Sequence, residues 1–166
     1  GLSVALQTQV NGAQQIVGAE LLARWTHPTL GSVAPSQFIP LAEQSNLINP
    51  LGDWMLTQAC LLSVQLKARG HGFPLSVNIS ARQFRQPDFE ARLQAILLAH
   101  GVAPDALMLE ITESLTMTDQ GDTIASMGRL VGLGFRFSMD DFGTGYSSLS
   151  YLKRLPLHEL KIDRSF

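Results

Sequence analysis

Hydrophobic and polar residues alternate along several short stretches of the chain. Each such stretch predicts a β-strand, because successive side chains of a strand point to opposite faces. Between most of them lie longer stretches with apolar residues at helical spacing. We expect strands near Ser3–Val10, Ile16–Trp25, Leu75–Ser80, Leu107–Thr112, Phe135–Asp141 and Glu159–Asp163, and helices over Ser36–Gln44, Pro50–Ala68, Pro87–Ala99, Asp122–Leu133 and Tyr146–Leu155.

The ends of these elements carry residues typical of turns and helix termini. Asn11-Gly12 predicts a tight hairpin turn between the first two strands. Pro50 is expected at the first position of the second helix and Gly70 just beyond its end. Asp122 is expected to cap the start of the fourth helix, and Gly134 to terminate it. The first two strands should therefore be antiparallel, and the strand–helix repeats that follow predict a parallel sheet or barrel.

Several strands have one apolar and one polar face. In Leu107–Thr112 the odd-numbered residues are Leu and Ile, whereas Glu110 lies on the opposite face. Carboxylates are depleted from strands and rarely buried unless paired, so their recurrence on one face needs a partner. Polar groups that converge from several strands are typical of an α/β barrel whose site lies at the carboxyl ends of its strands. The residues placed on this face are Glu20, Arg24, Ser76, Asn78, Ser80, Glu110, Lys161 and Asp163.

Composition narrows the classes of function. The chain has 166 residues, enough for one domain, and a net charge of −2, which argues against a general binder of nucleic acid polymers. A single cysteine, Cys60, excludes a disulfide scaffold and a cysteine metal site. No apolar run approaches the roughly 20 residues that span a membrane. Both ends lie close to strand-like sequence, so we expect a piece of a longer chain.

The candidate chemistry lies in an oxygen-rich set of side chains. These donors suit Mg²⁺ or Mn²⁺ better than zinc or copper, since no His or Cys accompanies them. The adjacent Asp140 and Asp141 follow a strand, where two carboxylates could bridge two ions about 4 Å apart. Alternatively, these two aspartates only cap the glycine-bearing turn that follows. The proposed ligands are Glu20, Asn78, Glu110, Asp140 and Asp141.

Three further charged residues accompany this set. Lys161 could hold a phosphate oxygen or orient the attacking water, or it could form a buried ion pair with Asp163 or Glu110. Arg24 could grip a phosphate oxygen or make a structural salt bridge. Glu113, just beyond its strand, is interpreted as a loop anchor. The loop 142–149 is interpreted as a lid or an interface loop, because a lone Gly-x-Gly is weak evidence for a phosphate cradle.

Taken in order, these residues resemble the EAL domain family, bacterial phosphodiesterases that linearise cyclic di-GMP. The resemblance spans essentially the whole chain. It is carried by Gly18–Trp25, Phe38–Glu43, Val77–Ser80, Leu109–Ser114, Asp140–Leu149 and Leu160–Phe166.

The resemblance implies a TIM-like (β/α) barrel with an antiparallel first strand and a site for two Mg²⁺ or Mn²⁺ ions. Water would open one 3′ ester of cyclic di-GMP and release linear pGpG. Glu20, as a ligand, and Lys161, assisting the water, would be catalytic, whereas Gln7 and Arg24 would contact the substrate. Glu113 would anchor the loop after Asp141, which in this family also meets a partner subunit. A homodimer, a sensor or cyclase domain in the same chain, and a cytoplasmic location with possible membrane tethering are expected.

The sequence departs from the family pattern in two ways. Leu21 replaces the middle Ala of the name-giving triplet, and Thr8 replaces a usual proline. In addition, a complete barrel needs roughly 250 residues, and the later Glu-Gly-Val-Glu and Gln-Gly segments of the family are missing. We therefore expect residues 1–166 to be the N-terminal two thirds of the domain and inactive alone. A catalytically silent cyclic di-GMP receptor and a structural module are the alternatives; loss of a ligand would favour the receptor, and every ligand that can be aligned is present.

Overall fold

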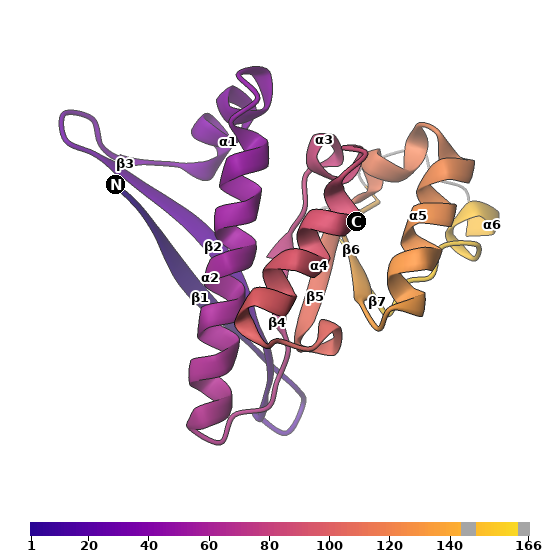
Figure 1. Ribbon diagram of the computed structural model, residues 1–166, viewed down its shortest axis with the longest axis horizontal. Coiled ribbons are helices and arrows are strands. Elements are labelled where there is room, and N and C mark those ends of the chain that lie inside the picture. The colour runs from indigo at the N-terminus through magenta and orange to yellow at the C-terminus, as the bar shows by residue number, and fades with distance from the viewer. Residues whose placement is uncertain (144–148, 163–166) are drawn as a thin grey trace.

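The computed structural model describes residues 1–143 and 149–162, which form one curved sheet with helices packed on one face (Figure 1). The strands are β1 Leu2–Val10, β2 Ile16–His27, β3 Gly31–Val33, β4 Leu75–Asn78, β5 Leu107–Thr112, β6 Arg136–Phe142 and β7 Glu159–Ile162. The helices are α1 Pro35–Gln44, α2 Ile48–Ala68, α3 Ala81–Phe84, α4 Phe89–His100, α5 Gln120–Gly132 and α6 Leu149–Leu152, with 3₁₀ turns η1 Pro104–Ala106 and η2 Glu113–Met117.

The order of the strands confirms the expected α/β topology. The sheet runs β1-β2-β4-β5-β6-β7, with β1 antiparallel to β2 and the following neighbours parallel. The short β3, which the sequence did not predict, pairs antiparallel with β2. Within the described ranges no pairing joins β7 to β1, so the sheet has the order of a barrel that is not closed.

The apolar faces of the strands form the core together with the helices. Val77, Leu109 and Phe137, from three neighbouring strands, have no exposed surface. They belong to one cluster with buried residues of α2, α4 and α5, the helices that lie in front of the sheet in Figure 1. Burial of this face orients the strands, so the opposite face carries the polar side chains.

The helix C-termini follow the sequence prediction. Gly70 and Gly134 have φ of +83° and +103°, a conformation that glycine adopts without strain. The N–H of Phe135 donates to the carbonyl of Leu130 at 3.1 Å, and His71 makes the same bond after α2. Each glycine therefore ends its helix.

The helix N-termini differ from the prediction. The second helix begins at Ile48, so Pro50 is its third residue and not its first; its missing N–H costs nothing there, because the first turn has no internal acceptor for it. Asp122 is not the N-cap of α5. That position belongs to Asp119, which has φ of +50° and makes no side-chain cap bond.

The first hairpin is present, but the prediction of a tight two-residue turn at Asn11-Gly12 is wrong. Residues 11–15 connect the strands, and Gln14, not Gly12, has a positive φ, +62°. The side-chain oxygen of Asn11 accepts from the N–H groups of Ala13 and Gln15, both at 3.0 Å. These bonds stabilise the longer loop in place of a two-residue turn.

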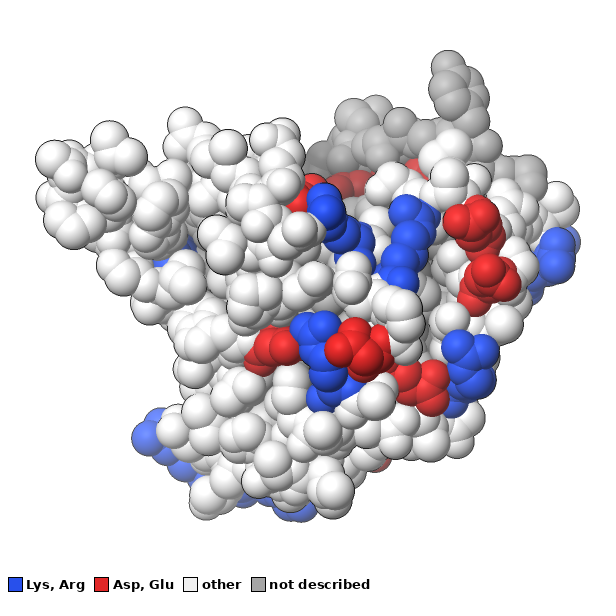
Figure 2. Space-filling view, turned by 45° about the horizontal axis from the view of Figure 1, so that its top comes forward, with Lys and Arg blue, Asp and Glu red and all other residues white. Residues whose placement is uncertain are grey.

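Charged residues of both signs lie interspersed on the face of the molecule shown in Figure 2. Arg92 of α4, for example, pairs with Asp53 of α2 at 2.7 Å and with Asp88 at 3.3 Å. Among the described helices, none is long and apolar enough to cross a membrane.

Candidate metal site

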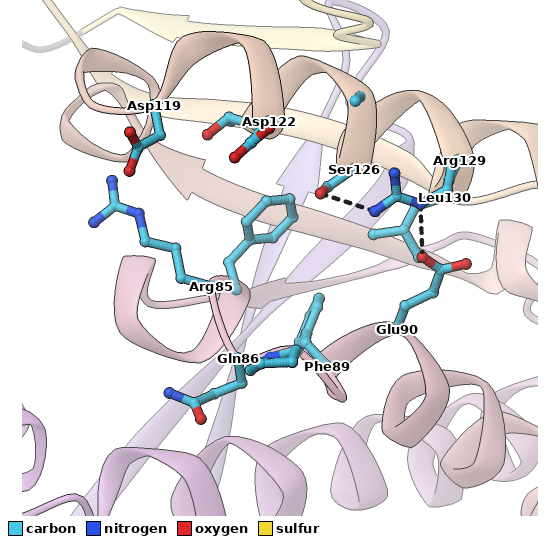
Figure 3. Close-up of a pocket in the computed structure, with 13 residues that line it drawn as sticks. Arg85, Gln86, Phe89, Glu90, Asp119, Asp122, Ser126, Arg129 and Leu130 are labelled. Atoms are coloured by element: carbon cyan, nitrogen blue, oxygen red, sulfur yellow. Dashed lines mark hydrogen bonds and ion pairs between the residues drawn. The ribbon is translucent and has the colours of Figure 1, made fainter.

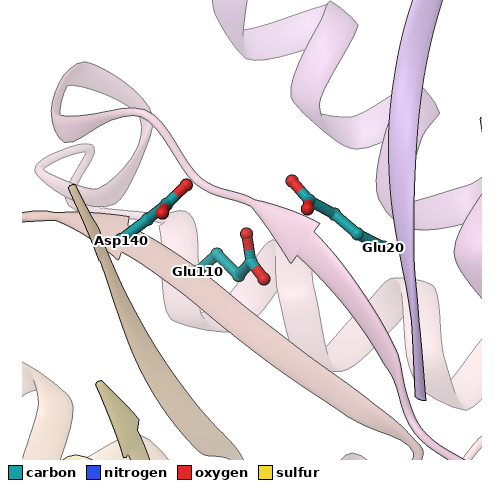
Figure 4. A group of neighbouring side chains, drawn as sticks. All are labelled: Glu20, Glu110 and Asp140. Atoms are coloured by element: carbon teal, nitrogen blue, oxygen red, sulfur yellow. The ribbon is translucent and has the colours of Figure 1, made fainter. Parts of the chain in front are cut away.

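Three carboxylates converge on the polar face of the sheet. Glu20 of β2, Glu110 of β5 and Asp140 of β6 each place a carboxylate oxygen within 4.8 Å of the others (Figure 4). The strand register explains the convergence, since Asn78 of β4 lies beside Glu110, and Asp140 lies beside Thr112, two residues further along β5. Side chains two residues apart share a face, so three separate strands point their carboxylates at one place.

Glu110 is the buried centre of this group. Only 1% of its surface is exposed, and its Oε2 has no hydrogen-bond partner within the described residues. The pKa of Glu110 is raised to about 7, mainly by burial; the charges of Glu20 and Asp140 contribute to the rise, while Lys161 opposes it. A carboxylate in this position needs a cation to offset its lost hydration.

Lys161 of β7 supplies one such cation. Its Nζ hydrogen-bonds to Oε1 of Glu110 and lies 3.8 Å from Oε2 of Glu20. Burial lowers the pKa of Lys161, but the hydrogen bond and the nearby carboxylates outweigh this and raise it. The ion pair with Glu110 that the sequence suggested is confirmed, whereas Asp163 lies outside the described residues. The ammonium group thus lies at a position from which a metal ion could also neutralise the carboxylate oxygens of Glu110 and Glu20.

Asn78 belongs to the group through its side chain. Its Nδ2 donates to Oε1 of Glu20 at 3.0 Å, which fixes the orientation of that carboxylate. The set therefore contains carboxylates and one amide from neighbouring strands, and Lys161 as its only described cation in direct contact. Hard oxygen donors of this kind, one of them buried and unpartnered, fit Mg²⁺ or Mn²⁺.

Asp141 does not belong to the three-carboxylate group. It is exposed, has φ of +57°, and donates its N–H to Oδ1 of Asp140 at 2.9 Å. Its role as a metal ligand stays a prediction. Glu113, only 3% exposed, accepts a hydrogen bond from the N–H of Gly143 at 3.3 Å, the kind of contact that a loop anchor makes. Residues 144–148 of that loop lie outside the described residues.

The two expected substrate contacts lie beside the carboxylates. Gln7 of β1 is directly opposite Glu20 and therefore on the same face. Arg24 donates to the carbonyl of Ala23 at 2.9 Å and makes no ion pair with any described residue, which disfavours a structural salt bridge. Arg24 also lines a cleft of about 360 Å³ that reaches Asn78 and Glu110.

The sequence did not identify the other walls of this cleft. Apolar residues of α1 and α2 line it, together with the buried Gln83 and with Ser114, whose hydroxyl lies 2.7 Å from that of Thr112. The apolar spacing of the helices could have marked these residues as buried, but not which of them reach the strand ends. The apolar wall comprises Ile39, Ile48, Leu51 and Met55.

Comparisons with known proteins found a family and relatives that match most of this chain. The family model described as EAL domain matches residues 1–166. The bifunctional diguanylate cyclase/cyclic di-GMP phosphodiesterase MucR of Pseudomonas aeruginosa is 45% identical over 152 residues, which cover 91% of this chain and 22% of MucR. The signaling protein YkoW of Bacillus subtilis is 40% identical over 92% of the chain and 19% of its own length. The chain thus spans about a fifth of these curated relatives.

Solved structures show the same fold. A MucR phosphodiesterase in complex with cyclic di-GMP superimposes with a TM-score of 0.93 and 42% identity, over 99% of this chain and 67% of that one. The EAL enzyme Bd1971 in its cGMP-bound form gives 0.90 and 36%, over 99% of this chain and 46% of that one. The open sheet therefore corresponds to part of a larger α/β domain.

Proposed function

Because the chain belongs to the EAL domain family, we propose that a protein carrying the complete domain hydrolyses cyclic di-GMP to linear pGpG with Mg²⁺ or Mn²⁺. The observation that carries the proposal is the convergence of Glu20, Glu110 and Asp140 on one face of the sheet. The likeness to MucR, which is named as a cyclic di-GMP phosphodiesterase, supports the choice of substrate.

Five side chains would hold the ions. Bound cations would neutralise phosphate charge and favour ionisation of the attacking water. Glu110, the most buried carboxylate, would lie deepest in the site, and Asn78 would keep Glu20 oriented through its 3.0 Å hydrogen bond. The proposed ligands are Glu20, Asn78, Glu110, Asp140 and Asp141.

Lys161, Arg24 and Gln7 would act on the substrate and the water. The ammonium of Lys161 is held by two carboxylates and stays charged at neutral pH, so it could orient the attacking water or hold a phosphate oxygen. Arg24 has no ion-pair partner among the described residues, so its guanidinium could bind a phosphate as a fork. Gln7 would contact the ligand from the first strand, opposite Glu20.

We further propose that residues 1–166 alone turn over little or no substrate. In the described ranges β1 and β7 are the two edges of the sheet, and no strand joins them. One side of the site therefore has no strand beside it. The homodimer, a sensor or cyclase domain in the same protein, and a cytoplasmic location are also proposals. MucR, whose name includes a cyclase activity, supports the second of these.

The test is product analysis with the complete domain, comparing wild type with Glu20→Ala. Chromatography should show linear pGpG from the wild type in Mn²⁺ or Mg²⁺, and none from the variant. Tight binding of cyclic di-GMP by the wild type without any product would instead assign the domain to the class of receptors.

A further inference from the structure

The short helix α3 follows the strand that carries Asn78; Arg82 within it and Arg85 directly after it contact neighbouring segments. Arg82 donates to the carbonyl of Glu43, in the last turn of α1, at 2.6 Å, and to Oδ1 of Asn46, in the connection between α1 and α2. Arg85 reaches the opposite way, to η2 and the residue beyond it. Both neighbouring segments contribute to the cleft beside the carboxylates, through Glu43 and Ser114.

Arg85 makes its contacts with one nitrogen of the guanidinium. Its Nη2 donates to the carbonyl of Leu115 at 3.3 Å and to Oγ1 of Thr118. Hydrogen bonds from a charged donor are stronger than neutral ones, and they join α3 to a segment 30 residues further along the chain.

That segment leads to the carboxylate site. It begins with Glu113, whose Oε2 accepts the hydrogen bond from Gly143. Gly143 follows Asp140 and Asp141 at the end of β6. Within η2, the hydroxyl of Thr116 donates to the carbonyl of Glu113 at 2.7 Å, and Leu115 is fully buried. The segment is thus internally bonded and packed, so a displacement at one end is transmitted to the other.

We infer that Arg85 is a positioning residue for the carboxylate site: it holds η2 in place, and through Glu113 it fixes the backbone directly after Asp140 and Asp141. The effect passes through the hydrogen bond that the N–H of Gly143 donates to Glu113. Small displacements of ligands cost catalysis heavily, because reacting groups must be held to within a fraction of an ångström. Only the predicted effect on kcat rests on the proposed function. The structural linkage from Arg85 to Gly143 does not depend on it.

The chain offers a matched control in the same pocket. Arg85 and Arg129 both line a cavity of about 390 Å³ between α3, α4 and α5 (Figure 3). Arg129, however, pairs with Glu90 at 3.2 Å and donates to Ser126 at 3.1 Å, and neither partner belongs to η2. Replacing Arg129 removes the same charge from the same pocket and leaves η2 untouched.

The first measurement is hydrogen exchange in the full-length protein, which does not depend on activity. In Arg85→Met the amide of Gly143 and those of residues 113–118 should exchange about tenfold faster, the effect expected for loss of a charge-assisted hydrogen bond. Arg129→Met should leave them unchanged. Thr118→Val, which keeps the arginine and removes one acceptor, should give a smaller increase; it also tests the linkage if Arg85→Met fails to fold. Unchanged exchange in a folded Arg85→Met or in Thr118→Val, or equal increases in Arg85→Met and Arg129→Met, would overturn the inference.

The second measurement is kinetic and uses the same variants. Arg85→Met should lower kcat and weaken the apparent affinity for Mn²⁺, with a smaller change in KM, and Arg85→Lys should recover part of the loss. Faster exchange of Gly143 combined with normal kcat and Mn²⁺ dependence would show that the linkage does not serve the site. Absence of hydrolysis in the wild type would refute the proposed function, while the exchange result would still decide the linkage.

Discussion

At the scale of single residues, the central feature is a buried carboxylate whose neighbours are other carboxylates. Glu110 has almost no exposed surface, and Lys161 is its ion-pair partner. Removing one partner of such a pair is costly, because the remaining charge stays buried without compensation. If the ammonium stands where a metal could bind, a divalent cation should substitute for it.

Replacing Lys161 tests this substitution. Lys161→Met should lower the free energy of unfolding by about 3 kcal/mol in a chelating buffer. Saturating Mn²⁺ should restore much of this loss, because the ion neutralises Glu110 in place of the ammonium. Urea unfolding with and without Mn²⁺ measures both values, and Lys67→Met, on the exposed end of α2, is the control. An equal loss with and without Mn²⁺ would contradict the idea.

Cys60 gives a second prediction at this scale. Its thiol has no exposed surface, and burial raises its pKa to about 11. At pH 8 only about one thiol in a thousand is ionised, so a thiol reagent should react no faster than the protein unfolds. Since the unfolded thiol ionises at a lower pH, stability should fall as the pH rises above about 9. Rapid and complete labelling of the native protein at pH 8 would contradict the burial of the Cys60 thiol.

The inward direction of the acidic residues could be predicted from the sequence, but the sequence did not select among the contacts that they could make. Glu110 and Lys161 each lie between two apolar residues of a strand. Because alternate residues face opposite sides, both side chains are predicted on the polar face. The contact between them depends on the register of three parallel strands, and no local pattern encodes register across helical connections. For the same reason the sequence did not separate Asp140, which joins the group, from Asp141, which does not.

At the scale of elements, α2 and α3 pack closely through a glycine. A Cβ on Gly52 would lie 2.2 Å from Nε2 of the buried Gln83, so the amide of that side chain would have to shift. Gly52→Ala should therefore destabilise the protein by about 1–2 kcal/mol, although Ala is the better helix former by about 1 kcal/mol.

A matched glycine on α5 isolates the packing effect. Gly128 is exposed, and a Cβ at this position would have no atom of the described residues within 4 Å beyond its own helix backbone and chain neighbours. Gly128→Ala should stabilise the protein by up to about 1 kcal/mol, because Ala has the higher helix propensity and its Cβ would meet no neighbouring atom of the described residues. Thermal unfolding of both variants decides the point; stabilisation by Gly52→Ala would show that the contact is loose.

Element boundaries mark where local signals were sufficient and where they failed. Gly70 and Gly134 end their helices as predicted, because a positive φ strongly favours glycine. The start of α5 was misplaced, because Asp119 and Asp122 are both acceptable caps and only tertiary packing selects between them. The four-residue α3 and three-residue β3 were not predicted, since such short segments contain too few positions to show a period.

At the scale of the whole molecule, the main feature is a sheet that is not closed within the described ranges. The chain aligns over 99% of its length with two thirds of a MucR phosphodiesterase structure, and its edge strand β1 carries exposed apolar residues such as Leu2 and Leu6. Exposed strand edges of this kind favour association with other chains. We therefore expect residues 1–166 to self-associate in size-exclusion chromatography at micromolar concentration, and a chain with the remaining third of the domain to lose this tendency. A strictly monomeric fragment would contradict this expectation.

The central claim is that the group Glu20, Glu110 and Asp140 binds the divalent cations that support hydrolysis. The most direct measurement is the rate of pGpG formation by the complete domain as a function of Mn²⁺ concentration, for the wild type and for Glu110→Gln. We predict a saturable dependence in the wild type and a fall of more than ~100-fold in the variant, beyond what loss of a hydrogen bond to a metal ligand causes. Hydrolysis that persists in a chelating buffer, or an unchanged Mn²⁺ dependence in Glu110→Gln, would contradict the account.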